Sequence, residues 1–224
     1  YKAMWEEFSD VVGFWADMEH PYITYENNFI ESEWWALKEI WKKGLLYQGH
    51  KIVPYCPRCG TPLSSHEVAQ GYKDVTERSA IVRFKAADED ACFLAWTTTP
   101  WTLPSNLGLC VNPNVTYVKV RVYGKVYYLA EALMDSVFAD SWGDREVLET
   151  MKGKDLEYRK YEPLYPFADK DVQDKAFFVT CDDYVTTEDG TGIVHIAPAF
   201  GEDDNRVCRK YGMPFVQFVN DKGE

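Results

Sequence analysis

The sequence predicts an α/β protein of the α+β type, in which short strands form a barrel-like, curled sheet with short helices at its rim. Three observations predict this class. Apolar residues recur at helical spacing in the N-terminal part, short strand-like runs separated by turns fill the chain from residue 79 onward, and few helical patterns interrupt those runs. We therefore expect a helical segment over residues 1–78 and a sheet domain over residues 79–224.

Two amphipathic helices are expected in the first segment. Apolar residues recur at spacings of three and four over residues 2–18, and Pro21 ends that pattern. A second helix is expected from Ser32, as its N-cap, to Lys43, because Gly44 can take the left-handed conformation that ends helices. The aromatic residues of both helices are interpreted as core or docking surface.

Strands and two short helices are expected in the second segment. The strand candidates are rich in β-branched and aromatic residues, several of them with period-two alternation, and turn residues at 123–125 and 189–190 punctuate the series. The expected strands cover residues 81–84, 92–96, 118–122, 126–129, 177–180 and 193–196, and the expected helices cover residues 131–138 and 202–211.

Composition and charge limit the kinds of protein that this chain can be. Of its 224 residues 46% are hydrophobic, no run approaches the ~20 apolar residues of a membrane helix, and the first residues do not form a signal peptide. We therefore expect a cytoplasmic protein without a membrane partner. The formal charge of −12 excludes coating of nucleic acid through a general positive field, so any such contact must be local. Because residue 1 is not Met and residues 220–224 read as a turn, we expect a piece of a longer protein.

Cys56 and Cys59 form a C-x-x-C knuckle, of the kind in which two thiolates occupy one side of a tetrahedral zinc ion. Zinc needs four ligands, and in this chain only His50 or His66, at an unusual spacing, could complete the set. Three interpretations stay open: the other half of the site lies outside the chain, the pair is redox-active, or two thiols sit idle in a turn. We favour a zinc half-site, because a proline and a glycine shape the knuckle and no redox-type helix follows.

A threonine-rich segment at residues 96–106 is the first candidate for a functional site. It follows a predicted strand and then breaks into a loop, because Pro100 and Pro104 forbid regular helix. Hydroxyl and amide groups both donate and accept hydrogen bonds, so the segment suits a hydroxyl-rich ligand or a positioned water. Its candidate residues are Thr97, Thr98, Thr99, Trp101 and Asn106.

A second polar segment, residues 190–204, carries His195 on a predicted strand and Asp204 in the first turn of a predicted helix. If the two strand ends are neighbours, hydroxyls, imidazole and carboxylate converge on one rim. Taken singly, each residue also has a structural explanation, since the helix dipole favours Asp204 and a lone strand histidine is usually structural. The sequence has no G-x-S-x-G elbow and no metal cluster near His195, so we expect no covalent nucleophile.

Together the two segments resemble the editing domain of isoleucyl-tRNA synthetases. The string from Trp96 to Asn106 is similar to the threonine-rich motif of that domain, and the string from Gly190 to Asp204 is similar to its second motif, in the same order. Residues 55–68 resemble the zinc knuckle that precedes the domain, and the aromatic helices resemble the connective insertion. The valyl and leucyl enzymes are less similar, because they typically carry Arg at the position of Thr99 and lack Trp101.

The resemblance implies hydrolysis by water of the ester of valyl-tRNA formed on isoleucine tRNA, without a covalent intermediate. Asp204 would hold the α-ammonium group, and His195 would line the side-chain pocket and exclude isoleucine. The ester, the terminal ribose and the attacking water would be surrounded by Thr97, Thr98, Thr99 and Asn106, with Trp101 as a wall. Two signatures that this class needs for activation with ATP are missing, so ATP would bind only to the parent enzyme.

The resemblance also implies partners: the 3′ end of isoleucine tRNA and the remainder of the synthetase, with zinc bound at Cys56 and Cys59 and the chain a monomer. Two alternatives stay open. One is a non-catalytic zinc-knuckle module that docks RNA or protein through its aromatic helices. The other is a valyl-type editing domain that clears threonine, against which Thr99 in place of Arg argues.

Overall fold

The structure is a computed structural model and describes residues 1–139 and 144–224. The chain divides into two compact units, Tyr1–Lys51 and Ile52–Glu224. The boundary expected between residues 78 and 79 falls inside the second unit and stays a prediction. Among the described residues, the helices are all too short or too polar to cross a bilayer.

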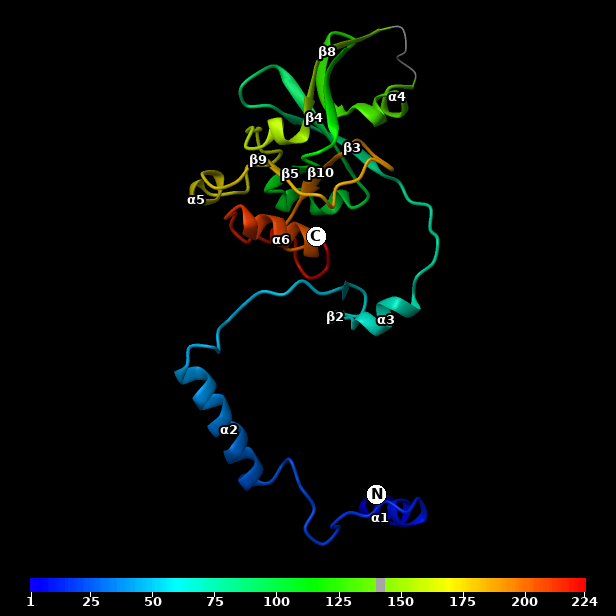
Figure 1. The fold of residues 1–224 in the computed structure, drawn as a ribbon, viewed down its shortest axis with the longest axis vertical. Coiled ribbons are helices and arrows are strands. Elements are labelled where there is room, and N and C mark those ends of the chain that lie inside the picture. The colour runs from blue at the N-terminus through cyan, green and yellow to red at the C-terminus, as the bar shows by residue number, and fades with distance from the viewer. Residues whose placement is uncertain (140–143) are drawn as a thin grey trace. The chain divides into compact units, whose positions relative to one another are not determined.

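Helix α1 of the first unit spans Lys2–Val11, shorter than the sequence predicts (Figure 1). The prediction that it continues to residue 18 is wrong, because Gly13 takes a left-handed φ of 70° and the N–H of Phe14 turns back to bond the carbonyl of Ser9 at 2.9 Å. This arrangement is a Schellman ending, which apolar periodicity does not reveal.

Helix α2 spans Asn27–Lys42 and begins more than one turn before the predicted start. Its N-cap is Glu26, and the prediction of Ser32 as N-cap is wrong. The hydroxyl of Ser32 instead donates to the carbonyl of Asn28 at 2.9 Å, which is the bond that a serine inside a helix can make. The predicted end is confirmed, because Gly44 has φ 68° directly after the last turn. Neither helix has a buried residue.

The second unit opens with a small hairpin of β1 (Tyr55–Cys56) and β2 (Thr61–Pro62). Helix α3, Ser65–Gln70, follows it. Its N-cap Ser64 accepts from the N–H of Glu67 while the Glu67 carboxylate accepts from the N–H of Ser64, which is a complete capping box.

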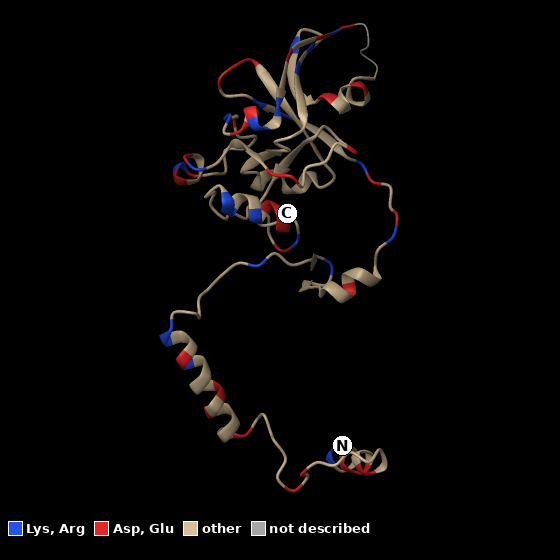
Figure 2. Ribbon diagram, in the orientation of Figure 1, with Lys and Arg blue, Asp and Glu red and all other residues tan. Residues whose placement is uncertain are grey.

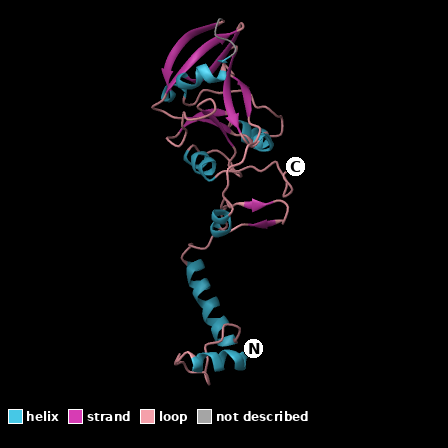
Figure 3. Cartoon of the chain, turned by 90° about the vertical axis from the view of Figure 1, so that its right-hand side faces the viewer, coloured by secondary structure: helices cyan, strands magenta, loops and turns pink. Residues whose placement is uncertain are grey.

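A mixed sheet of eight strands forms the rest of the second unit (Figure 3). Its strand order is β8-β6-β7-β4-β10-β5-β9, with β3 paired to β4, and short helices accompany it, which confirms the predicted α/β class with a barrel-like, curled sheet. The strands are β3 (Ala80–Lys85), β4 (Ala91–Thr97), β5 (Gly108–Val111), β6 (Thr116–Val122), β7 (Lys125–Ala130), β8 (Arg145–Lys152), β9 (Phe178–Cys181) and β10 (Ile193–Ile196).

All six predicted strands are confirmed within one or two residues, whereas β5 and β8 were not predicted. The helix expected at 131–138 is a short 3₁₀ turn that continues into one α-turn, and the helix expected at 202–211 is confirmed as α6. The short helices are η1 (Pro100–Ser105), η2 (Glu131–Leu133), α4 (Met134–Val137), η4 (Gly153–Leu156), α5 (Lys170–Gln173) and α6 (Glu202–Lys210).

Strand β4 joins two parts of the sheet. Antiparallel β3 pairs with it along its whole length. Two parallel strands also pair with β4. β7 pairs with the start of β4, over residues 91–93, and β10 pairs with its end, where Trp96 lies beside Val194. The sheet therefore divides at the end of β4, which is where the threonine-rich segment begins.

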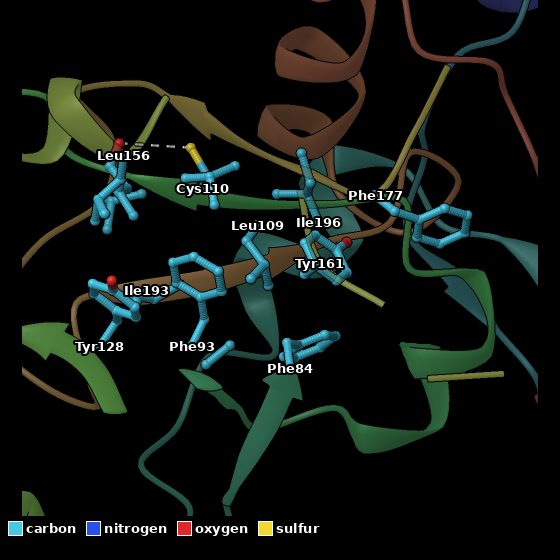
Figure 4. Packing of buried hydrophobic residues seen from close by; sticks show 14 of the residues in the cluster. Phe84, Phe93, Leu109, Cys110, Tyr128, Leu156, Tyr161, Phe177, Ile193 and Ile196 are labelled. Atoms are coloured by element: carbon cyan, nitrogen blue, oxygen red, sulfur yellow. Dashed lines mark hydrogen bonds between the residues drawn. The ribbon is translucent and has the colours of Figure 1, made fainter. Parts of the chain in front are cut away.

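Aromatic and aliphatic side chains from both parts of the sheet form one core (Figure 4). The rings of Phe93 and Tyr128 stack with centroids 4.9 Å apart, and Phe84 meets Tyr161 edge to face at 5.3 Å. Ile193 of β10 is fully enclosed in the same cluster. The core thus fixes the strands from which the polar segments emerge.

Glu89, in the loop before β4, ties three segments together. Its carboxylate accepts hydrogen bonds from Lys119, Tyr128 and Arg159. Partial burial acts to raise the pKa of Glu89, but these three donors outweigh it and lower the pKa from 4.5 to about 2. A lowered carboxyl pKa stabilises the fold fully above pH 4.5, and that contribution is lost as the pH falls toward 2.

Replacement of Glu89 by Gln is therefore expected to lower the free energy of unfolding at pH 7 by about 1–3 kcal/mol, because it weakens three charge-assisted bonds at once. Chemical denaturation measures the change, with Glu149→Gln on the exposed strand β8 as the matched control. The network has no such role if both variants unfold at the same denaturant concentration.

Candidate active site

Strand pairing brings the two polar segments side by side. Trp96 at the end of β4 lies in register with Val194 of parallel β10, so the residues that follow each of them leave the sheet at the same place. The prediction that the two strand ends are neighbours is confirmed. The rings of Trp101 and Phe200, one from each segment, meet edge to face with centroids 5.5 Å apart.

The threonines have different environments. Thr97 is buried at the last position of β4, where its hydroxyl accepts from the N–H of Thr99 at 3.0 Å. Thr98 and Thr99 are exposed. Pro100 then starts the 3₁₀ helix η1, in agreement with its fixed φ. Residues 97–99 thus form a threonine-rich bend. Two of its threonine side chains face solvent, and the hydroxyl of the third bonds the backbone of the bend.

His195 lies on β10 and contacts the threonine-rich segment directly. Its side chain is buried, and its Nε2 lies 3.1 Å from Oγ1 of Thr102. Burial lowers the pKa of His195 from 6.5 to about 4, so the imidazole is neutral at pH 7. No residue in the described part of the chain bonds its Nδ1.

Asp204 lies in the first turn of α6, where acidic residues gather at the N-terminal end of the helix (Figure 2). One carboxylate oxygen accepts from the N–H of Ala197, just after β10, at 2.9 Å. Burial raises the pKa of Asp204 from 3.8 to about 6 and outweighs that bond. A Cβ at residue 201 would lie 2.8 Å from the carboxyl carbon, so the glycine there leaves room for the carboxylate.

Asn106 makes hydrogen bonds to protein groups at the end of the loop. Its side chain is buried and already bonded, with Nδ2 donating to the carbonyl of Gly108 at 2.8 Å and Oδ1 accepting from the hydroxyl of Tyr161 at 2.6 Å. Both polar atoms therefore face protein groups. Asn106 thus holds the end of the loop, and its contact with an ester stays a prediction.

The arrangement combines a carboxylate that is ionised at pH 7, a neutral imidazole and exposed hydroxyls. It suits a cationic, hydroxyl-bearing ligand and a positioned water. A cysteine nucleophile is unsupported, because burial raises the pKa of Cys110 to about 11 and that of Cys208 to about 12, which keeps both thiols protonated.

Sequence reasoning missed three contributors to this site. Thr102, Phe200 and Gly201 all lie inside the two segments, but no role was predicted for any of them. A signal existed for Thr102, since it lies three residues after Thr99 in a proline-started turn and bonds the carbonyl of Thr99. The contacts of Phe200 and Gly201 depend on the packing of distant segments.

Cys56 ends strand β1, and Cys59 lies in the turn that leads to β2. The N–H of Cys59 donates to Sγ of Cys56 at 3.4 Å, which lowers the pKa of the Cys56 thiol, while Cys56 raises that of Cys59. Two thiols in this turn fit one side of a zinc ion. Within residues 1–139 and 144–224, however, no group of three or more metal-binding side chains comes together, so neither His50 nor His66 completes the set.

Comparison with known proteins identifies the family. Residues 1–198 match the family described as tRNA synthetases class I (I, L, M and V). The chain belongs to the class I tRNA synthetases. This synthetase chain is 54% identical over 225 residues to the isoleucine–tRNA ligase of Clostridium tetani and 53% identical over 224 residues to that of Clostridium kluyveri. Both matches cover 100% of the chain and 21% of the relative, so the chain spans about a fifth of the length of the curated relatives it matches.

Solved structures give weaker likenesses to this synthetase chain. The P. knowlesi cytosolic leucyl-tRNA synthetase editing domain matches 65% of the chain and 70% of that structure, with a TM-score of 0.49 and 15% identity. A structure described as GlLeuRS-CP1 matches 56% of the chain and 50% of that structure, with a TM-score of 0.42 and 22% identity. Neither likeness is close enough to carry an argument about function.

Proposed function

We propose that this chain hydrolyses the ester of valyl-tRNA formed on isoleucine tRNA. One observation carries the proposal: the threonine-rich bend, the neutral His195 and the ionisable Asp204 converge where β4 and β10 end. The identity to isoleucine–tRNA ligases supports the choice of tRNA. The 3′ end of that tRNA and the remaining part of a longer synthetase are the proposed partners, in the cytoplasm.

The reaction needs no covalent intermediate. The oxygen of a water attacks the ester carbonyl carbon, the bond from that carbon to the ribose oxygen breaks, and the ribose oxygen takes up a proton. The products are free valine and tRNA. The exposed hydroxyls of Thr98 and Thr99 position the water and the ester, since each can donate and accept.

Asp204 anchors the substrate through its charge. Its carboxylate binds the α-ammonium group of the amino acid, and a charge-assisted contact in a partly buried site both orients and strengthens binding. The retained bond from the N–H of Ala197 holds one oxygen, which leaves the other for the ligand. The half-exposed ring of Trp101, which meets Phe200 edge to face, is the proposed wall of the pocket.

His195 sets the size of the pocket. Isoleucine exceeds valine by one methylene, and a single apolar pocket that must admit isoleucine rejects valine poorly; isoleucyl-tRNA synthetases are the standard illustration of this limit. A second pocket that admits valine but is too small for isoleucine allows the wrong ester to be hydrolysed while the correct ester is kept. The buried imidazole is suited to this role, because Ile193 and Ile196 on the same strand pack in the core.

The rate of hydrolysis is expected to fall as the pH drops below about 6, because the anionic form of Asp204 binds the ammonium group. The kcat/KM for valyl-tRNA should decrease about tenfold per pH unit on the acid side. Since the charge of Asp203 contributes to the raised pKa of Asp204, Asp203→Asn should move the profile toward lower pH. A profile that is flat from pH 8 to pH 5 in both proteins would contradict the role of Asp204.

Turnover separates this proposal from its alternatives. A sub-stoichiometric amount of the chain should release many equivalents of valine from valyl-tRNA. A binding module would not release valine catalytically. A valyl-type editing domain would hydrolyse threonyl-tRNA in preference to valyl-tRNA. Faster release of threonine than of valine would favour that second alternative.

We further propose that Cys56 and Cys59 bind zinc as a half-site, with the other two ligands supplied from outside residues 1–224. The hairpin turn and the N–H bond to the Cys56 sulfur support thiolate ligation. A longer protein that contains this segment should bind one zinc ion, and Cys56→Ser should remove it. Unchanged zinc content in the variant would overturn the half-site.

A further inference from the structure

The hydroxyl of Thr102 lies within hydrogen-bond distance of two groups from different segments. Its Oγ1 is 2.8 Å from the carbonyl oxygen of Thr99 and 3.1 Å from Nε2 of His195. Thr102 is only 3% exposed, so water does not compete for these contacts. The bridge therefore links the threonine-rich bend to β10 through one side chain.

Counting protons fixes the direction of both bonds. A hydroxyl carries one proton, and the Thr99 carbonyl can only accept. If the Thr102 proton pointed at His195, two oxygen acceptors would face each other at 2.8 Å without a proton between them. The Thr102 hydroxyl therefore donates to Thr99 and accepts from His195, which places the imidazole proton on Nε2.

The other ring nitrogen is then a bare acceptor. Nδ1 is buried, and the residues that the structure describes offer it no donor. The ring stays neutral because burial disfavours its charged form, so Nδ1 does not gain a proton of its own. A buried acceptor without a partner is rare in folded proteins, and it is a reason to look for a ligand that supplies the donor.

We propose that Thr102 is a positioning residue that holds His195 in the Nε2–H tautomer and so keeps Nδ1 as an acceptor for an N–H or O–H group of the bound ester. This inference rests on the proposed hydrolysis for its ligand. The tautomer itself does not, because the two bonds of Thr102 exist in the free protein.

Two variants of the full 224-residue chain test the bridge. Thr102→Val keeps the shape of the side chain and removes the hydroxyl, whereas Thr102→Ser keeps the hydroxyl. Two-bond ¹H–¹⁵N NMR of the imidazole should show protonated Nε2 in the wild type and in Thr102→Ser, and a loss of that single tautomer in Thr102→Val. The same Nε2–H tautomer in all three proteins would overturn the proposal, as would an Nδ1–H tautomer in the wild type.

Hydrolysis provides the second readout. Valyl-tRNA deacylation should fall about tenfold in Thr102→Val, the loss expected for one hydrogen bond, and return to near the wild-type rate in Thr102→Ser. Equal rates in all three proteins, with the tautomer changed, would overturn the ligand role of Nδ1. If the wild type does not hydrolyse valyl-tRNA at all, the proposed function fails while the NMR result still decides the tautomer.

The source of the donor is either the α-ammonium group or the free hydroxyl of the terminal ribose. Valyl-tRNA whose terminal ribose lacks that hydroxyl separates them. If the hydroxyl is the donor, His195→Ala does not lower the hydrolysis rate of the substrate that lacks the hydroxyl. If the ammonium group is the donor, His195→Ala lowers the rate by the same factor on both substrates. No effect of His195→Ala on either substrate would overturn the hydrogen bond to Nδ1.

Discussion

Asp204→Asn is expected to lower kcat/KM for valyl-tRNA hydrolysis by about 10²-fold or more, because it removes the charge that binds the α-ammonium group in a partly buried site. The change is nearly isosteric, and the amide oxygen can still accept from the N–H of Ala197. The loss should therefore come from the missing charge and not from a displaced helix. Initial rates of valine release measure it.

The same substitution should stabilise the folded chain. Burial raises the pKa of Asp204 from 3.8 to about 6, so ionisation of this carboxyl group costs stability as the pH rises from 3.8 through 6, and the full cost is present above that. At pH 8 the neutral asparagine should raise the free energy of unfolding by about 3 kcal/mol. A variant that is more stable and less active would identify Asp204 as a binding residue and not as a structural one.

Asp203→Asn is the matched control. Asp203 precedes Asp204 in the same first turn and is exposed, and its carboxylate pairs with Arg206 at 2.9 Å. Removing its charge changes the helix terminus in the same way but leaves the proposed anchor in place. Near pH 8 its rate should stay close to that of the wild type. Equal losses in both variants would mean that the charge of the helix end matters and not the position of Asp204.

His195→Ala is expected to remove the discrimination between valyl and isoleucyl esters. The truncation leaves a space where the buried imidazole excluded the larger side chain, and one methylene is worth ~1–3 kcal/mol in such a pocket. The ratio of the two hydrolysis rates should therefore fall by about 10- to 200-fold, mainly because isoleucyl-tRNA becomes a substrate. Single-turnover assays with each ester measure the ratio.

His66→Ala controls for the loss of an imidazole elsewhere. His66 lies in α3, is exposed and has Nε2 2.7 Å from Gln70. Its removal should leave the ratio of rates unchanged. If His195→Ala also leaves the ratio unchanged while valyl-tRNA is still cleaved, another part of the pocket excludes isoleucine.

The polar segments could be located from the sequence because their residue types are unusual for the structure around them. Pro100 and Pro104 mark the end of β4, and strand periodicity fixes His195 on β10. The bounds of β10 agree with the prediction at both ends. The neighbouring position of the two strand ends could only be assumed, because it depends on the pairing of Trp96 with Val194.

The two missed strands lack the signals of strand prediction for opposite reasons. β5, Gly108–Val111, is buried at every position, so it shows no alternation and starts with a glycine. β8, Arg145–Lys152, has no fully buried residue and carries charged side chains of low strand propensity. Antiparallel pairing with β6 makes it a strand, and a local pattern does not contain that information.

The role of a polar side chain depends on its distant partners. The sequence predicts Asn106 as a ligand-binding amide. In the structure its side-chain oxygen accepts a hydrogen bond from the hydroxyl of Tyr161, 55 positions away. The sequence gives Thr102 no role of its own. In the structure its hydroxyl contacts the imidazole of His195, 93 positions away, and so links the two segments. Composition therefore identifies the segment, whereas the fold decides which of its residues face inward.

The most direct test offers both esters to the chain in one tube. Valyl-tRNA and isoleucyl-tRNA, made on the same isoleucine tRNA and labelled differently, compete for a catalytic amount of the protein at pH 8. We expect repeated release of valine with isoleucine retained, and loss of that release in Asp204→Asn. Equal release of both amino acids, release of neither, or an unimpaired Asp204→Asn would contradict the assignment of the threonine-rich bend, His195 and Asp204 to a valine-selective hydrolytic pocket.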